Sequence, residues 1–466
     1  MTDPAQATHA ATEASATIYW LATAIFVLAY AVIVSEKVHK TKVALVGAAL
    51  MICLPILTQH EAFHSEHFGI DYNVIFLLIS MMIIINIMTK SGVFEWVAIR
   101  SAKVAQGRPF TIMAIFAVFT ALASALLDNV TTVLLLAPVT LLIADELDVD
   151  PVPFLIVEAL ASNIGGTATL IGDPPNIMIA SKAKYSFMDF IVHLTPVVVI
   201  IMVAFVVVIK ILFGRRLKVS EEKRQRVMAM DEATLIKDPV LMKKSLFVMG
   251  CTVAGFTLHG VLHLEPATIA LTGAAVLLLI SGEHPHHILA EVEWTTIFFF
   301  MGLFIIVGGV VKVGLITDLS QVVIDVTHPT QESMFTTTFV MLWFSAIASA
   351  IVDNIPFVAT MNPLVLDMAN TIFHEGAHNP AALTAATLHH DVLEPVWWAL
   401  ALGACLGGNG SPIGASANVI VVGMAEKAGK PISFGKFMAY GFPIMIMTLI
   451  ISHLYIYLRY YVLHWY

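Results

Sequence analysis

The chain has 466 residues, of which 58% are hydrophobic and only 12% are charged. This composition lies far outside the range of soluble globular domains, so it excludes a soluble enzyme and indicates an integral membrane protein. The net charge of -9 does not suggest a nucleic-acid partner, and the three cysteines lie in apolar segments that give no support to a disulfide framework.

The membrane-spanning segments can be read in chain order. Residues 1–17 are polar and rich in Ala and Thr, and they predict a disordered tail. Eight apolar segments that follow are predicted as helices that cross a hydrocarbon core of about 30 Å. These segments are residues 18–34, 43–57, 74–89, 191–213, 245–262, 267–281, 295–311 and 438–458.

Four other apolar regions are interrupted. Residues 110–143 and 337–366 are too long for one crossing and contain Asp-Asn, so each is predicted as a re-entrant hairpin. Residues 153–181 and 395–425 contain glycines, prolines and polar side chains, which predict helices broken at membrane depth. Irregular backbone in lipid is stable only where protein or a water-filled cavity satisfies its polar groups. The interruptions therefore predict a hydrated cavity.

The two halves of the chain carry matching motifs in the same order. "ALASALLDNVTTVLLLAPV" from Ala121 aligns with "AIASAIVDNIPFVATMNPL" from Ala346. "NIGGTATLIGDPPNIMIAS" from Asn163 aligns with "CLGGNGSPIGASANVIVVG" from Cys405. Duplication is the simplest account of this pattern.

The repeats predict the topology. The first repeat covers residues 18–213 and the second covers 245–460, with a cytoplasmic linker over 214–244. Five crossings and one hairpin per repeat make an odd number, so the second repeat is predicted to be inverted, with about ten transmembrane helices in all. About nineteen of the 24 basic residues then lie on the cytoplasmic side. We expect a multi-pass inner (plasma) membrane protein with both termini extracytoplasmic.

Polar side chains at the interruptions are the candidate ligands for an ion such as Na⁺ and for the substrate. A carboxyl group at membrane depth costs about 2.5 to 3.5 kcal/mol, which favours proton coupling by Asp128 and Asp353 over the alternative of simple helix capping. The predicted binding residues are Asp128, Asn129, Thr131, Asn163, Gly165, Gly166, Thr167, Asp173, Asn176, Asp353, Asn354, Gly407, Gly408, Asn409, Ser411 and Asn418.

Two further acids have open roles. Asp173 precedes a proline, which also fits a helix cap, and it aligns with Ala415 in the other half. Glu158 fits either a proton carrier or a buried, hydrogen-bonded acid. The "HPHH" stretch from His284 fits a solvated loop better than a metal site.

Catalytic motifs are not found in the sequence. "NIGGTATLIG" lacks the GK[ST] ending of a phosphate-binding loop, and no hydrolase elbow or dinucleotide fingerprint occurs. We therefore expect no enzymatic activity and no cofactor, apart from H⁺ or Na⁺ as the coupling ion. ATP-driven arsenite efflux would need a separate ATPase subunit.

The motifs "LLDNVTTVLLLAPVT", "NIGGTATLIGDPPNIMI", "VDNIPFVATM" and "GACLGGNGSPIGASANVIVVGMAEKAG" resemble the ion transporter superfamily. Within it they are most similar to the branch of ArsB arsenite permeases, NhaD sodium/proton antiporters and the P protein, with a citrate transporter-like domain. The resemblance covers roughly residues 20–460. It implies an all-α inverted-repeat transporter with ten spanning helices and two oppositely oriented hairpins, a homodimer, and elevator-like movement.

The hairpin tips depart from those of the related dicarboxylate symporters. In those symporters, as the resemblance implies, Ser-Asn-Thr tips bind sodium and the carboxylate of the substrate. In this sequence the tips read Asp-Asn-Val from Asp128 and Asp-Asn-Ile from Asp353. Two tip carboxylates would repel a dicarboxylate unless protons or cations neutralise them.

The predicted function is secondary active transport that exchanges protons for a small inorganic ion or neutral metalloid. Arsenite or antimonite efflux and sodium/proton antiport agree about equally well with the motifs. The alternatives are a passive chloride-like anion channel, in which half-helix dipoles attract the anion, and a sodium-coupled anion or carboxylate transporter. A membrane scaffold would have no need for duplicated polar breaks.

Overall fold

The computed structural model describes residues 4–35, 37–65, 67–214, 217, 219–373 and 383–466. These residues form helices and turns and no strands. Among them, seven helices are long and apolar enough to cross a membrane, and four shorter apolar helices accompany these. The prediction of an all-α membrane protein is confirmed.

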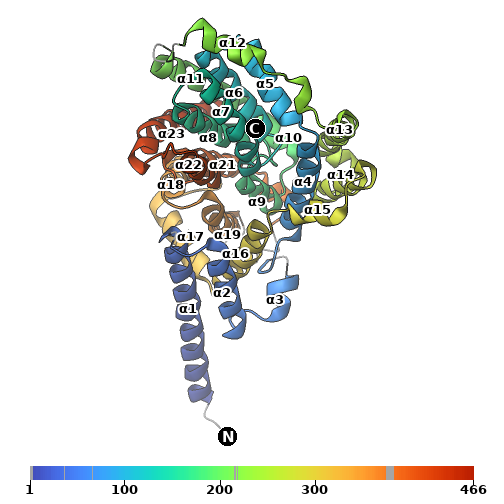
Figure 1. The fold of residues 1–466 in the computed structure, drawn as a ribbon. Coiled ribbons are helices and arrows are strands. Elements are labelled where there is room, and N and C mark those ends of the chain that lie inside the picture. Colours follow the sequence, from blue (N-terminus) through green and yellow to red (C-terminus); the bar gives the residue numbers. More distant parts are fainter. Residues whose placement is uncertain (1–3, 36, 66, 215–216, 218, 374–382) are drawn as a thin grey trace.

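The first half of the chain contains eleven helices within the described residues (Figure 1). They are α1 (Pro4–Ser35), α2 (Lys40–Cys53), α3 (Gln59–His64), α4 (Tyr72–Lys90), α5 (Val93–Val104), α6 (Pro109–Ser124), α7 (Asn129–Leu147), α8 (Val152–Gly166), α9 (Pro174–Ala183), α10 (Phe187–His193) and α11 (Thr195–Phe213). One end of α1 projects from the body of the molecule in Figure 1.

The second half follows a short connecting region with α12 (Glu221–Ala229) and the 3₁₀ turn η1 (Ala233–Leu235). Its elements are α13 (Pro239–Leu262), α14 (Pro266–Ser281), α15 (Pro285–Ala290), α16 (Trp294–Lys312), α17 (Leu315–Thr327), α18 (Phe335–Ile351), α19 (Asn354–Phe373), α20 (Ala385–Leu388), α21 (Glu394–Gly407), the 3₁₀ turn η3 (Gly408–Gly410), α22 (Ser416–Lys427), α23 (Phe434–Ile456) and the π-helical turn η4 (Tyr457–Val462).

The interrupted regions are pairs of helices. The two helices α6 and α7 meet at a tip that ends at Asp128, and α18 and α19 meet at Asp353. Irregular backbone separates α8 from α9, and η3 with the residues after it separates α21 from α22. Each of these connections breaks a helix inside the protein and therefore creates free backbone groups that need partners.

Helices occur in the predicted tail and in the predicted linker. The predicted disordered tail of residues 1–17 overlaps α1, which begins at Pro4. Proline suits a first helical turn, and the alanines that follow have the highest helix propensity. The predicted linker over 214–244 contains α12, whose first turn is capped by the Ser220 hydroxyl.

Glycines let each hairpin approach its broken helix in the same way in both halves. A Cβ atom on Gly165 of α8 would lie 2.1 Å from the carbonyl oxygen of Ala121 in α6. A Cβ atom on Gly407 of α21 would lie 2.5 Å from the carbonyl oxygen of Ala346 in α18. These pairs occupy aligned positions in the two motifs, so the repeats share a backbone contact that only glycine permits.

We expect Gly165→Ala to destabilise the protein, because the added methyl group would overlap backbone atoms of α6 that cannot rotate away. Overpacking of this kind costs about 1 to 3 kcal/mol and sometimes more. The purified variant should show a lower thermal midpoint in detergent. Gly423→Ala in α22 is the matched control, because no atom lies within 4 Å of its added Cβ. Equal midpoints for the two variants would contradict the close-contact role.

Candidate functional site

The breaks in α8–α9 and α21–α22 are closed by one asparagine each. The side-chain amide of Asn176 donates to the carbonyl oxygens of Thr167 and Thr169, at 3.2 and 2.9 Å. The amide of Asn418 donates to those of Gly408 and Ser411, at 2.8 and 2.9 Å. Both asparagines are fully buried. Each therefore satisfies carbonyl groups that the end of a half-helix leaves free.

The two broken helices meet at a buried asparagine. Asn163 of α8 donates through Nδ2 to Oδ1 of Asn409 at 2.9 Å and to Oδ1 of Asn418 at 3.0 Å. None of the three side chains is exposed. The amide groups thus connect the two halves of the chain through hydrogen bonds at the centre of the protein.

The tips contribute carboxylates and amides. Asp128 caps α7 and accepts from the backbone N–H of Thr131 at 2.9 Å and from its hydroxyl at 2.6 Å. Asn354, at the start of α19, donates to both carboxylate oxygens of Asp173, at 3.3 and 3.2 Å. Asp173 lies at the start of α9, so the second tip is bonded to the break of the first repeat.

Lys40 binds the carboxylate of the second tip. Its Nζ lies 2.6 Å from Oδ2 of Asp353 and 3.0 Å from Oγ of Ser416, and the Ser416 hydroxyl donates to the same Oδ2 at 2.9 Å. The Lys40 and Asp353 side chains are 28% and 13% exposed. This ion pair joins α2 to the second hairpin and to the start of α22.

Both tips line one cavity of about 440 Å³, a size typical of small-molecule sites. Its wall includes four carboxyl side chains and one ammonium group, together with hydroxyl, amide and imidazole groups. The polar residues on the wall are His39, Lys40, Thr41, Asp128, Asn129, Asp173, Glu293, Thr295, Thr296, Asp353, Asn354 and Ser416.

Six helices begin at this wall, namely α2, α7, α9, α16, α19 and α22. Each helix start is equivalent to about +0.5 charge, so together they supply about +3. Four carboxylates against the single ammonium of Lys40 leave three negative side-chain charges, taking His39 as neutral. The two contributions roughly cancel, so the wall is close to electrically balanced when its acids are ionised.

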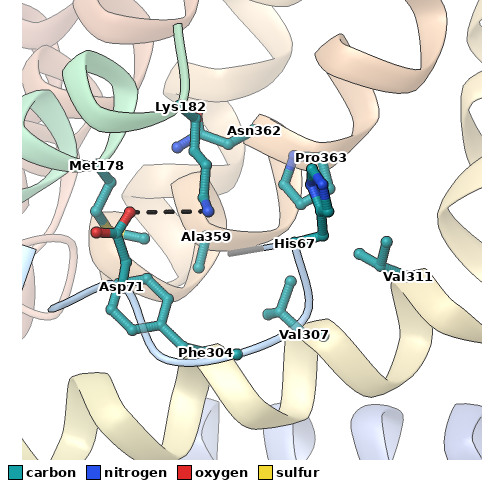
Figure 2. Close-up of a pocket in the computed structure, with 12 residues that line it drawn as sticks. His67, Asp71, Met178, Lys182, Phe304, Val307, Val311, Ala359, Asn362 and Pro363 are labelled. Atoms are coloured by element: carbon teal, nitrogen blue, oxygen red, sulfur yellow. Dashed lines mark ion pairs between the residues drawn. The ribbon is translucent and has the colours of Figure 1, made fainter. Parts of the chain in front are cut away.

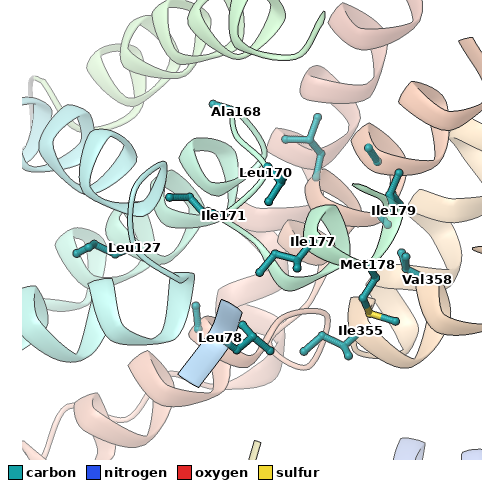
Figure 3. Packing of buried hydrophobic residues seen from close by; sticks show 14 of the residues in the cluster. Leu78, Leu127, Ala168, Leu170, Ile171, Ile177, Met178, Ile179, Ile355 and Val358 are labelled. Atoms are coloured by element: carbon teal, nitrogen blue, oxygen red, sulfur yellow. The ribbon is translucent and has the colours of Figure 1, made fainter. Parts of the chain in front are cut away.

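An apolar layer adjoins the polar part of the cavity. Leu78 of α4 and Ile355 of α19 line the cavity. Figure 3 shows them with Ile177 of α9, Val358 of α19 and neighbouring apolar side chains, and each of these four residues is at most 5% exposed. Ile177 and Val358 follow the cavity-lining residues Pro174 and Asn354 by about one turn of their helices. The apolar layer therefore forms the inner end of the cavity.

A much smaller pocket, of about 30 Å³, lies farther along the same helices. Figure 2 shows Asp71 and Lys182 facing each other across it, with Phe304 and Asn362 on its wall. Lys182 Nζ lies 3.7 Å from Oδ2 of Asp71, and the Ser181 hydroxyl donates to that oxygen at 2.5 Å. These contacts join the start of α4 to the end of α9.

The structure sorts the predicted site residues into two groups. Asp128, Asn129, Asp173, Asp353 and Asn354 line the cavity. The remaining predicted residues lie outside its wall and build the breaks and the tip behind it. They are Thr131, Asn163, Gly165, Gly166, Thr167, Asn176, Gly407, Gly408, Asn409, Ser411 and Asn418.

Glu158 and the histidine cluster lie away from the cavity. Glu158 is 1% exposed and accepts a hydrogen bond from the Thr140 hydroxyl. Its other carboxyl oxygen has no partner among the described residues. His284, His286 and His287 are exposed, and in the described part of the chain no group of three His, Cys, Asp or Glu residues is arranged to hold a metal.

Comparisons with known proteins place this fold and site in a family. A family model described as "Citrate transporter" matches residues 30–403. The chain belongs to the citrate transporter family. The transporter is 47% identical over 443 residues to an uncharacterized transporter of Mycobacterium tuberculosis. This alignment covers 95% of this chain and 99% of that protein. It is 30% identical over 520 residues to the human P protein, covering 96% of this chain and 60% of that one.

A solved structure supports the fold of the transporter. The YdaH transporter of Alcanivorax borkumensis superposes with a TM-score of 0.52 at 14% sequence identity, over 96% of this chain and 98% of that one. The resemblance to ArsB-, NhaD- and P-protein-like permeases is confirmed by these relatives and by the family match. The transporter is therefore a multi-pass membrane protein of this class.

Lys40 is the main feature of the transporter's cavity that the motifs do not reveal. In the sequence it is one of three lysines near the start of an apolar segment, where lysine ordinarily marks a cytoplasmic helix end. It has no counterpart in the aligned motifs, because it belongs to a helix outside them. A lone lysine ahead of a spanning helix is too common a pattern to have distinguished it.

We expect Asn176→Ala and Asn418→Ala to destabilise the transporter by similar amounts, because each leaves buried carbonyl groups without a donor. An unsatisfied buried acceptor costs about 1 to 3 kcal/mol. Thermal unfolding in detergent measures the effect. Asn73→Ala, at an exposed position of α4, is the matched control and should change stability by no more than about 0.5 kcal/mol. Wild-type midpoints in both break variants would contradict this role.

Proposed function

We propose that the transporter is a secondary active carrier that exchanges protons for a small inorganic solute in the cavity between its two hairpin tips. The observation that carries this proposal is that Asp128 and Asp353, far apart in the sequence, line one cavity. A carboxylate binds either a proton or a cation. Exchange of one for the other moves two species in opposite directions without changing the charge of the site.

The near-balanced charge of the wall supports coupling. An ion that entered alone would carry uncompensated charge into a site enclosed by apolar helices, where charge interactions are weakly screened. If a proton leaves the site at the moment when a cation enters it, the charge of the site stays the same and this penalty is removed. Sodium/proton antiport fits this scheme directly. Efflux of neutral arsenite or antimonite fits it if the hydroxylated solute competes with a proton for the same carboxylate.

A second candidate is transport of a carboxylate together with cations. Two observations favour it, namely the ammonium of Lys40 on the wall and the start of α22, whose N-cap Ala415 supplies no acid. The family description names citrate. Because four acidic side chains also line the wall, a polycarboxylate would need cations or protons to accompany it. A passive anion channel would use the six helix starts alone and leave the acids as caps.

The wider organisation proposed for the transporter follows from its repeated motifs, its charge distribution and the family resemblance. It comprises a homodimer in the inner (plasma) membrane, inverted repeats with both termini extracytoplasmic, and elevator-like movement of the hairpins with the broken helices. Arsenite efflux driven by ATP would require a partner ATPase subunit.

We expect Asp128→Asn and Asp353→Asn to fold and to lose most proton-coupled flux, because asparagine keeps the shape of the side chain but cannot exchange a proton. The measurement is dissipation of an imposed pH gradient in proteoliposomes. Asp325→Asn, at an exposed position of α17, is the control and should transport normally. Wild-type coupling in both tip variants would exclude these residues as the exchange groups.

The solute is identified in the same vesicles. Sodium, lithium, chloride, arsenite and citrate are added separately, and the solute that dissipates the gradient is the transported one. Chloride conductance without any proton movement would favour the channel. Citrate transport that requires a cation would favour the second candidate.

A further inference from the structure

The two hairpin tips align residue for residue, yet their carboxylates are held differently. Asp128 has both oxygens bound by Thr131, through the backbone N–H and the hydroxyl. The aligned residue of the second tip is Pro356, which has neither group. Asp353 accepts from the backbone N–H of Ile355 through Oδ1, at 3.1 Å. Within residues 335–373, which the structure describes throughout, its Oδ2 has no donor.

Lys40 and Ser416 supply to Asp353 the contacts that Thr131 supplies to Asp128 and that Pro356 cannot make. Both contact Oδ2 of Asp353, and they contact each other, so the three groups form a closed cluster on the cavity wall. The Lys40 ammonium also lies 5.0 Å from the centre of the Phe299 ring, a favourable position for a cation. Ser416 aligns with Pro174 in the first repeat, so this cluster has no counterpart there.

The position of Lys40 is unfavourable without Asp353. Lys40 is the first residue of α2, where the helix dipole disfavours a positive charge. Its side chain is also mostly removed from solvent, which costs hydration of the ammonium group. The carboxylate offsets both costs. The Ser416 hydroxyl and the Phe299 ring, which also contact Lys40, are uncharged. Neutralisation of the Asp353 carboxylate by another cation therefore removes the charged partner that holds Lys40 in place.

We propose that Lys40 is a tethered counter-cation of Asp353, which a transported cation or a proton must displace before it can occupy that carboxylate. The inference rests on the proposed exchange function and deepens it, because it names the competitor at one of the two tips. The incoming cation takes Oδ2 of Asp353 and the Ser416 oxygen. Lys40 keeps its proton and moves into the cavity water, and it returns when the cargo leaves.

Removal of the Lys40 charge tests this competition. In proteoliposomes that carry out sodium/proton exchange, Lys40→Met should lower the half-saturating sodium concentration by about tenfold, the low end of what a neighbouring cation does to an aspartate. Lys40→Arg keeps the charge and should restore most of the wild-type value. Lys42→Met, at an exposed position two residues along α2, is the matched control. An unchanged half-saturating concentration with a lower maximal rate would indicate a purely structural role and overturn the proposal.

A second measurement does not depend on transport. Dicyclohexylcarbodiimide reacts with carboxyl groups that hold a proton, and peptide mass spectrometry quantifies its attachment to Asp353. At neutral pH, Lys40→Met should label faster than the wild type and Lys42→Met, and added sodium should slow the reaction. Equal labelling in all three proteins would refute the competition. Faster labelling in Lys40→Met, combined with no wild-type flux for any solute, would refute the exchange function and leave the competition supported.

Discussion

The whole site depends on satisfying backbone polar groups where apolar helices are broken. A carbonyl group left free at the end of a half-helix cannot form a hydrogen bond to water in a packed interior. Asn176 and Asn418 solve this problem identically, each reaching back seven to ten residues to the end of the preceding half-helix. With the carbonyls satisfied, α9 and α22 can begin again within the protein and direct their N-termini at the cavity.

The convergence of helix starts explains why acids gather at the cavity. A helix N-terminus favours a negative charge, and Asp128, Asp173 and Asp353 each precede one. Capping and ion exchange are therefore compatible roles. Helix N–H groups stabilise the ionised form of a carboxyl group, which is the form that binds a cation. The asymmetry between Thr131 and Pro356 then leaves one of these carboxylates open to an outside partner.

The most informative signals in the sequence are local and duplicated. In the paired motifs, glycine, proline and Asp-Asn interrupt apolar runs, and helices end and begin near these interruptions. Sequence reasoning had a limit here. It could not separate cavity-lining groups from supporting ones, because Asn163 and Asn129 look alike in the sequence while only Asn129 reaches the wall. It also missed the contact of Lys40 with Asp353, because the two residues are 313 positions apart and no periodicity connects them.

The position of the apolar layer bears on how a solute could cross. The cavity lies at the starts of α9, α16 and α19, and the small pocket beside Asp71 lies at least one turn farther along each of them. Along α16, Thr296 and Phe304 are about 12 Å apart at 1.5 Å per residue. Packed apolar side chains fill the space between. The layer therefore separates the cavity from the small pocket, and the contacts of Asp71 with Ser181 and Lys182 hold α4 and α9 together on the far side of it.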